Sequence, residues 1–389
     1  MKLVYINDEL ATGDGSNSHA VGLMRAFTDI LGQDNVITYP RPVDGSQMAV
    51  NLKAGKLRSK LKGLLAFIRF FRKKILSVKR SKEICADLNS KGFIPTHVIA
   101  RATDFDITAI YVAQKYNARL VYEVNSPTFY ERGVIKKEPM IGALEKWERR
   151  IINASDKVYV VSNVCRDMLC EHYGIDKDKF IVIPNGYMAD LYTESADEKK
   201  KIRDEVRKKE GISDKFTVTF VGSLKTWHGI IEFCETAKLM QDNKNISFLV
   251  IGDGEMHDTI QNYVQNHSNM IFKGKMNLEN MKKYLYASDL GIMPYVSKDK
   301  FYYSPLKMFD MIGSGLPFVG TSVGQVQEIC ESELSFDFLT DTNKSEDLRK
   351  RIEALEGSSE LDQMRIKVQE YSKKASWNTR AQALIDQIN

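Results

Sequence analysis

The sequence predicts an α/β protein that contains two Rossmann-like domains. Short apolar runs, most of them followed by an amphipathic helical stretch, recur over the first half of the chain and again after a charged segment. Strands that alternate with helices are typical of parallel sheets covered by helices on both faces, and two such series predict two sheets. A length of 389 residues allows two hydrophobic cores.

The apolar runs place the strands in order. The first series predicts strands at Leu3–Ile6, Val98–Ala100, Leu120–Val124, Val158–Val161 and Phe180–Ile183. The second series predicts strands at Thr217–Val221, Phe248–Ile251, Met270–Phe272, Leu290–Met293 and Pro317–Val319.

A nearly apolar-free stretch between Met188 and Lys215 separates the two series and reads as a solvated helix and connector. We therefore expect an N-terminal domain over 1–188, a second domain over 189–370 and a terminal helix over 371–389. In open parallel sheets, ligands bind beyond the carboxyl ends of the strands, so the expected site is a cleft between the domains.

Composition excludes several classes of protein. No run of 18 or more uncharged apolar residues occurs, and the chain opens directly on a strand with acidic residues behind it, which predicts neither a membrane span nor a signal peptide. Five scattered cysteines without metal-ligand spacing predict buried free thiols. We expect a cytoplasmic protein, and the sequence carries no signal for an oligomeric state.

A basic stretch stands out at about 53–82. It holds 12 lysines and arginines, among them Lys73 and Arg80, and no acidic residue. Apolar residues from Leu57 to Val78 recur at spacings of four and three, which predicts one apolar stripe on a helix. Such a helix could lie on the anionic inner face of the cell membrane, or it could pack on the core with a wet basic face. No nucleic-acid-binding module accompanies the charge, so nucleic acid is not an expected partner.

The segment from Ser304 to Thr321, SPLKMFDMIGSGLPFVGT, carries the strongest functional signal. A helix that starts near Pro305 holds Lys307 and Asp310 in its first turns, and glycines end it before a strand. A carboxylate there can accept hydrogen bonds from ribose hydroxyls, and free N–H groups at the helix start can face phosphate. An ordinary helix, turn and strand of an α/β core would also fit this segment alone.

The same segment resembles the donor-site motif of the family-4 glycosyltransferases, retaining enzymes of the GT-B fold, in a variant that reads roughly SPLK-x-F-E-x-M. Asp310 stands in the place of the glutamate. Family members commonly carry two glutamates eight residues apart, and Tyr302 occupies the first of these places. The resemblance continues through VYEVNSP, VIPNG and VGSLKTWHG over most of the chain.

The resemblance implies a donor-binding set and three catalytic candidates. Where relatives place an arginine and a lysine on the donor diphosphate, this chain has Ser223 and His228, with Lys225 between them. We expect Lys225 and His228 to stabilise the leaving diphosphate, and Asn125 to assist by hydrogen bonding, because an amide cannot act as a base. The expected donor residues are Gly15, Ser16, Gly222, Ser223, Lys225, His228, Lys275, Met276, Tyr302, Ser304, Pro305, Leu306, Lys307 and Asp310.

On the acceptor side, the resemblance points to the start of the first helix and to the end of a strand. We expect His19, Glu123 and Asn125 there, and Glu123 and Asn125 face the same way because they are two apart on a strand. No cluster with metal-ligand spacing and no Asp-x-Asp at a strand end occurs, so neither a metal nor another cofactor is expected.

The interpretation is a retaining glycosyltransferase that moves a sugar from a nucleotide diphosphate sugar to a lipid-linked or cell-envelope glycan. Two alternatives stay open. One is a non-catalytic, membrane-bound protein that binds sugar nucleotides, because Tyr302, Ser223 and Asn125 all replace the usual functional types. The other is a nucleotide-sugar epimerase of the same architecture.

Overall fold

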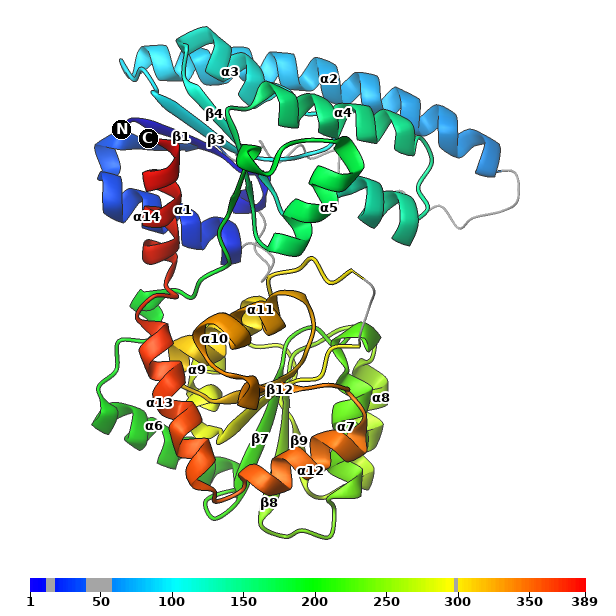
Figure 1. Ribbon diagram of the computed structural model, residues 1–389, viewed down its shortest axis with the longest axis vertical. Coiled ribbons are helices and arrows are strands. Elements are labelled where there is room, and N and C mark those ends of the chain that lie inside the picture. The colour runs from blue at the N-terminus through cyan, green and yellow to red at the C-terminus, as the bar shows by residue number, and fades with distance from the viewer. Residues whose placement is uncertain (12–17, 40–57, 297–299) are drawn as a thin grey trace. The chain divides into compact units, whose positions relative to one another are not determined.

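The computed structural model describes residues 1–11, 18–39, 58–296 and 300–389 (Figure 1). Contacts between residues divide the chain into two compact units. Unit 1 comprises Met1–Pro184 and Arg380–Asn389, and unit 2 comprises Asn185–Thr379. The division falls four residues before the boundary expected at 188, and unit 1 regains the last residues of the chain.

Unit 1 contains one parallel six-stranded sheet of order β2-β1-β3-β4-β5-β6. Its strands are β1 (Leu3–Ile6), β2 (Val36–Tyr39), β3 (His97–Arg101), β4 (Arg119–Val124), β5 (Lys157–Val160) and β6 (Phe180–Val182). Its helices are α1 (Ser18–Leu31), α2 (Arg58–Ser90), α3 (Thr108–Tyr116), the π-helical turn η4 (Phe129–Ile135), α4 (Ile141–Ala154) and α5 (Asn163–Tyr173).

Unit 2 contains a second parallel six-stranded sheet, of order β12-β11-β10-β7-β8-β9. Its strands are β7 (Phe216–Val221), β8 (Ile246–Ile251), β9 (Met270–Phe272), β10 (Leu290–Met293), β11 (Phe318–Thr321) and β12 (Leu339–Thr340). Its α-helices are α6 (Ala196–Glu210), α7 (Ile230–Leu239), α8 (His257–Asn266), α9 (Leu278–Ala287), α10 (Leu306–Ser314), α11 (Gly324–Glu333), α12 (Ser345–Leu355) and α13 (Ser359–Ser372), and its short 3-10 helices include η6 (Ala189–Leu191) and η7 (Thr226–His228). The last helix, α14 (Trp377–Ile388), leads back to unit 1.

Two parallel sheets confirm the predicted fold class, and every predicted strand is present within a few residues of its expected bounds. The sequence did not indicate β2 and β12. Both lie at a sheet edge, and all their residues are only half-buried. Edge strands are short and pack on one neighbour, so they lack the continuous apolar run that marks a buried parallel strand.

Each sheet has one point where the strand order reverses. In unit 1 this point lies between β1 and β3, and in unit 2 it lies between β7 and β10. Helices on the two sides of such a point turn away from each other, which leaves room for a ligand beyond the carboxyl ends of the two strands. The strand order thus indicates one candidate ligand position in each unit, at the carboxyl ends of β1 and β3 and of β7 and β10.

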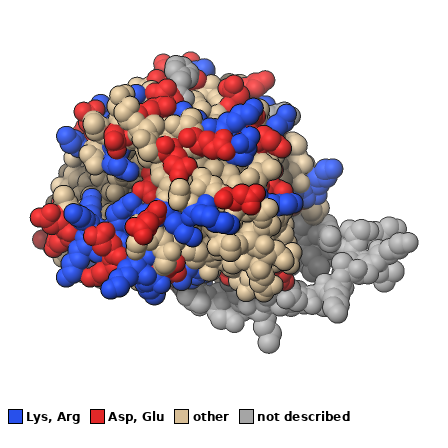
Figure 2. Space-filling model, turned by 90° about the horizontal axis from the view of Figure 1, so that it is seen from below, with Lys and Arg blue, Asp and Glu red and all other residues tan. Residues whose placement is uncertain are grey.

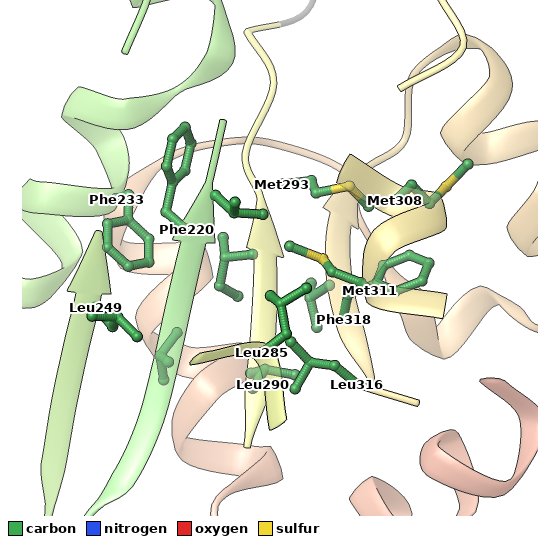
Figure 3. Close-up of a cluster of buried hydrophobic side chains, with 14 of the residues drawn as sticks. Phe220, Phe233, Leu249, Leu285, Leu290, Met293, Met308, Met311, Leu316 and Phe318 are labelled. Atoms are coloured by element: carbon green, nitrogen blue, oxygen red, sulfur yellow. The ribbon is translucent and has the colours of Figure 1, made fainter. Parts of the chain in front are cut away.

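A continuous apolar core holds the unit 2 strands against α10. Met293 on β10 and Phe318 on β11 lie beside Met308 and Met311 of α10, Phe220 on β7 lies beside Phe233 of α7, and all six are buried (Figure 3). This packing fixes α10 over β10 and β11, so the first turn of α10 lies beyond the carboxyl ends of the strands.

The basic helix α2 is longer than predicted. It continues to Ser90 rather than ending near 82, while residues 53–57 lie outside the described ranges. Its second half buries Ser81, Ile84 and Leu88, and α2 packs on α3 (Figure 1). Ile75 and Leu76 stay exposed, with 68% and 45% of their surfaces open to solvent.

One basic residue of α2 does not lie on the solvent-exposed basic face that the sequence predicts for this helix. Arg80 is buried, and its guanidinium lies 3.0 Å from Asp8 and 3.2 Å from Asp106. Arg80 also donates to the carbonyl of Tyr39. Because burying an arginine requires partners of this kind, Arg80 joins α2 to the strand ends of unit 1 and does not face a membrane.

The terminal helix expected over 371–389 is wrong as a single element. The structure ends α13 at Ser372 and starts α14 at Trp377. Between them, the carbonyl of Ala375 accepts from the N–H of Tyr187, and Ser376 forms a β-bridge with Tyr187. These bonds need extended backbone, which interrupts the helix. At the end of α14, His97 and Arg119 of unit 1 bind the carbonyl of Ile388.

Three further features concern membrane-spanning helices, cysteines and surface charge. No helix in the described ranges is both long and apolar enough to cross a bilayer. All five cysteines are free, and Cys165, Cys234 and Cys330 are buried. On the face shown in Figure 2, Lys and Arg side chains are interspersed with Asp and Glu, so that face offers no continuous basic surface to a nucleic acid.

Candidate functional site

Lys307 occupies the point of unit 2 where the strand order reverses. It lies in the first turn of α10, and its ammonium sits 4.4 Å from the ring centre of Phe220 at the end of β7 and 4.7 Å from that of Tyr295, just beyond β10. A Cβ on Gly222, the first residue after β7, would come within 3.4 Å of the Lys307 Nζ atom. A glycine at 222 therefore leaves the space around the ammonium open.

The ammonium of Lys307 is buried without a hydrogen-bond partner among the described residues. Only 8% of the residue is exposed. Burial lowers the pKa of Lys307 to about 7. The aromatic faces stabilise a cation, but they do not replace the hydrogen bonds that an ammonium makes in water. An ammonium in this position can still donate hydrogen bonds to an anion.

Asp310 lies one turn further along α10. Its Oδ1 atom accepts a hydrogen bond from the hydroxyl of Tyr192 at 3.3 Å. Asp310 is half-buried, and the protein around it raises the pKa of its carboxyl group to about 7 by desolvation, which the Tyr192 hydroxyl opposes only in part. Lys307 and Asp310 thus share one helix, and both are titratable near neutral pH.

The residues before α10 join it to the turn Pro184-Asn185-Gly186. The Ser304 hydroxyl accepts from the N–H of Asn185, and the Asn185 side chain donates to the Ser304 carbonyl at 2.7 Å. Pro305 is the N-cap residue, and Leu306 starts the helix. Tyr302 is fully buried, and its hydroxyl donates a hydrogen bond to the hydroxyl of Tyr303.

The loop after β7 carries the other cationic candidates. Lys225 is exposed, and the His228 ring nitrogen Nδ1 lies 2.7 Å from the carbonyl of Ser223. The Trp227 ring stacks near Tyr303, with ring centroids 5.2 Å apart, and near Tyr295, at 6.1 Å. These rings connect the loop to the surroundings of Lys307, because Tyr295 contacts both.

Gly229 fixes the end of this loop. It has a φ of +74°, and a Cβ there would lie 1.6 Å from the carbonyl oxygen of Pro294. Only glycine fits a position so close to another backbone segment. The loop after β7 is therefore held directly against the segment after β10.

Lys275 and Met276 follow β9, at the far side of the sheet from β10. Lys275 is exposed, and Met276 packs on the edge of the core. No contact in the described structure joins either residue to Lys307 or Asp310. Both remain candidates by resemblance alone.

In unit 1 the three expected acceptor-side residues do meet. Glu123, at the end of β4, is fully buried. Its Oε1 atom lies 2.9 Å from His19 Nε2 and accepts from the Asn125 amide at 2.8 Å. His19, in the first turn of α1, stacks on Tyr159, with ring centroids 6.3 Å apart. Gly15 and Ser16 lie outside the described residues.

Charge partners keep Glu123 ionised. Burial alone would raise its pKa, but the charge and hydrogen bond of His19, with Arg101 and the hydroxyl of Tyr5, outweigh burial and lower the pKa to about 2. Arg101 is the register neighbour of Glu123 on β3 and donates to it at 3.2 Å. The Glu123 carboxylate is therefore held in place by hydrogen bonds from several neighbouring side chains.

Sequence reasoning missed Arg101, Tyr295 and Tyr192. Arg101 had a usable signal, because it directly follows a predicted parallel strand and such ends gather on one edge. Tyr295 had the same signal after Leu290–Met293. Tyr192 ends the segment Val161–Tyr192 that carries the VIPNG signature, but nothing in that pattern places its side chain against α10.

The side chains that the structure describes include no group of three or more His, Cys, Asp or Glu residues that could hold a metal ion. The chemistry that these residues supply comes from cations, hydrogen-bond donors and carboxylates.

Comparison with known families matches both units. Residues 215–357 match the model of Glycosyl transferases group 1, and residues 89–190 match that of Glycosyltransferase Family 4. A curated relative, TuaH of Bacillus subtilis strain 168, carries the name of a teichuronic acid biosynthesis glycosyltransferase and is 25% identical over 209 residues. The matched part is 51% of this chain, and the chain spans about half the length of that relative.

Solved structures match over the whole chain. Alr3699/HepE of Anabaena, crystallised with UDP-glucose, aligns with a TM-score of 0.66 and 15% identity over 99% of each chain. A glycosyltransferase from Rickettsia africae ESF-5 aligns with a TM-score of 0.68 and 13% identity over 100% of this chain and 97% of that chain. These likenesses show the fold.

Residues 89–190 therefore form a family 4 glycosyltransferase region and residues 215–357 a group 1 glycosyltransferase domain, within a chain of GT-B fold.

Proposed function

We propose that this protein is a retaining glycosyltransferase that transfers a sugar from a nucleotide diphosphate sugar to a lipid-linked or cell-envelope glycan. The observation that carries the proposal is the buried, unpartnered ammonium of Lys307 at the carboxyl ends of β7 and β10. HepE, which shares the fold, was crystallised with UDP-glucose, and the name of TuaH refers to teichuronic acid biosynthesis.

The donor would bind on unit 2. Lys307 would meet a diphosphate oxygen, and Lys225 and His228 would reach it from the loop after β7. The N–H groups at the start of α10 would add hydrogen bonds to phosphate, as helix N-termini do. Asp310 would accept hydrogen bonds from the ribose. Phosphate would thereby supply the negative charge that Lys307 lacks.

In the reaction, the bond between the sugar C1 atom and the diphosphate oxygen breaks, and a bond from C1 to the acceptor oxygen forms on the same face. The acceptor proton passes to the leaving phosphate, so no separate general base is needed. Lys307, Lys225 and His228 stabilise the charge that develops on the diphosphate. His19, Glu123 and Asn125 orient sugar or acceptor hydroxyls by hydrogen bonds, and no metal ion is required.

A membrane contact through α2 is a separate part of this proposal. Ile75 and Leu76 are exposed on α2, and the exposed Arg72 and Lys74 lie beside them. Apolar side chains that insert between basic ones suit the surface of an anionic bilayer. A lipid-linked acceptor would be reached from that surface.

A thermal-shift panel tests the donor site. UDP, GDP, ADP and their sugars are added to wild type and to Asp310→Ala without metal. We expect one nucleotide to stabilise the wild type, by about 2.7 kcal/mol at a hundredfold excess over Kd, and the shift to vanish in Asp310→Ala. Absence of a shift with every nucleotide would favour a chain that binds no donor. Hydrolysis of the bound sugar nucleotide without acceptor separates an enzyme from a sugar-nucleotide-binding protein.

Lys307→Met should raise stability and weaken nucleotide binding. In the folded protein the pKa of Lys307 is about 7, below the ordinary lysine value of 10.5 that applies to the unfolded chain. Between these two pH values the unfolded chain binds more protons than the folded protein, so the stability of the wild type rises with pH across this window. The slope approaches about 1.4 kcal/mol per pH unit. In Lys307→Met this contribution to the slope disappears, stability at pH 7 increases, and the diphosphate shift is lost.

Denaturant unfolding between pH 7 and pH 10 measures this slope. Lys273→Met is the matched control, because Lys273 pairs with Glu210 at 2.9 Å and its pKa is raised. That variant should lose stability at pH 7. A Lys307→Met protein that is less stable than wild type at pH 7, or that binds nucleotide normally, would contradict the proposal.

Glu123→Gln should destabilise the protein at neutral pH. In the folded protein the pKa of Glu123 is about 2, below the ordinary glutamate value of 4.5. The ionised carboxylate therefore contributes stability above about pH 4.5, and this contribution is lost as the pH falls towards 2. The expected loss at pH 7 is about 3 kcal/mol, and it shrinks as the pH falls. Urea unfolding at several pH values measures it. Glu171→Gln, at an exposed position of α5, should match wild type, and a constant loss at every pH would argue for packing alone.

Replacement of both Ile75 and Leu76 by serine should weaken membrane binding. We expect wild type to float with vesicles of phosphatidylglycerol and phosphatidylcholine and not with phosphatidylcholine alone, and the double variant to bind about tenfold or more weakly, since each inserted side chain contributes about 1.5–3 kcal/mol. Ile366→Ser removes a 56% exposed apolar residue of unit 2 and serves as the control. Equal flotation of wild type and double variant would refute the contact.

A further inference from the structure

The carboxylate of Asp310 has two oxygens in different situations. Oδ1 accepts the Tyr192 hydroxyl at 3.3 Å. Oδ2 accepts no hydrogen bond from the residues that the structure describes, and the Asp310 side chain is still partly accessible. One oxygen is therefore held by the protein, while the other is left for a donor group from outside.

The position of the Tyr192 ring is rigid. The residue is 9% exposed, and its ring packs edge-on against Tyr187 at 5.6 Å and Tyr286 at 6.4 Å between centroids. A Cβ on Gly313, on α10, would come within 3.0 Å of the Tyr192 ring. Because the ring lies so close to the backbone of α10, its hydroxyl keeps a fixed direction towards Asp310.

The hydroxyl also keeps its proton. Burial and then the charge of Asp310 raise the pKa of Tyr192 well above its ordinary range, so the phenol is a hydrogen-bond donor at neutral pH. A fixed donor on one carboxylate oxygen sets the rotation of the group, and the second oxygen then points in a single direction.

We propose that Tyr192 is a positioning residue of the donor site, which holds Oδ1 of Asp310 so that Oδ2 accepts a hydrogen bond from the ribose of the nucleotide. The inference rests on the proposed function. The Asp310 side chain makes its one recorded hydrogen bond among the described residues to Tyr192, so this contact sets the direction of the carboxylate. Tyr192 provides that contact from outside the motif.

A consequence for pH follows from the same contact. The Tyr192 hydrogen bond lowers the pKa of Asp310 against the larger rise caused by desolvation. The groups around this pair are Tyr187 and Tyr286, which pack on Tyr192, and Lys307, one turn earlier on α10. Removing the hydroxyl would raise the pKa of Asp310, and the ionised form that binds ribose best would appear at higher pH.

The test compares nucleotides with and without ribose hydroxyls. The probes are UDP, GDP or ADP, whichever stabilises wild type, and its 2′,3′-dideoxy counterpart, titrated by calorimetry between about pH 6 and about pH 8, a window that spans the Asp310 transition. The variants are Tyr192→Phe, Asp310→Asn and the control Tyr187→Phe, which removes a hydroxyl bonded to the Ser372 carbonyl in the same aromatic cluster.

The ratio of the two affinities isolates the ribose contact. In Tyr192→Phe we expect Kd for the ribonucleotide to rise about 3- to 10-fold, Kd for the dideoxynucleotide to stay unchanged, and the pH midpoint of the ratio to move upwards. Tyr187→Phe should show none of these changes. Because the titration of Lys307 affects both ligands alike, it cancels in the ratio.

Three results would overturn the inference or its basis. A Tyr192→Phe protein that keeps the wild-type ratio, or that loses both ligands equally, shows that Tyr192 only supports the fold. If Asp310→Asn keeps the ribose preference, the assignment of Asp310 to ribose fails instead, whatever Tyr192 does. If wild type binds none of the three nucleotides, the proposed function fails and the inference with it.

Discussion

The constraint on which the candidate site of unit 2 depends is the burial of the Lys307 ammonium between two aromatic faces. Phe220 and Tyr295 belong to the ends of neighbouring strands, and Gly222 keeps the adjacent space free of a side chain. A cation in this position costs folding free energy, because water has been removed and no carboxylate or carbonyl has replaced it. Such a cost is typical of functional sites, where an interaction with a ligand is prepared in advance.

The buried charge of unit 1, on Glu123, has several hydrogen-bond and charge partners. Glu123 is even more deeply buried than Lys307, but His19, Arg101, Tyr5 and Asn125 all contact it. A buried group with so many donors is stable in the empty protein, and its network is rigid because each member orients the next. The carboxylate therefore serves better as a fixed reference for neighbouring side chains than as a group that changes its protonation state.

Sequence patterns located the strands, the helix α10 and the residues Lys307 and Asp310 on it, because apolar runs and glycines report local backbone requirements. The same patterns misjudged Arg80, whose role depends on distant partners. Arg80 reads as part of a wet basic face, but it is buried and pairs with Asp8 and Asp106. The break before Trp377 had no local signal, since it arises from bonds to Tyr187.

By itself the sequence determined two parallel sheets, their order along the chain, and the helix that bears the candidate donor residues, since hydrophobic periodicity and turn residues act over a few positions. Only the tertiary structure decided which charges are satisfied. It brought Arg101 to Glu123 on the neighbouring strand, left Lys307 between two rings with no hydrogen-bond partner among the described residues, and set Tyr192 against Asp310 over 118 positions of sequence. The energy of a buried charge depends on which groups lie within a few ångströms of it, and that is a property of the packed chain.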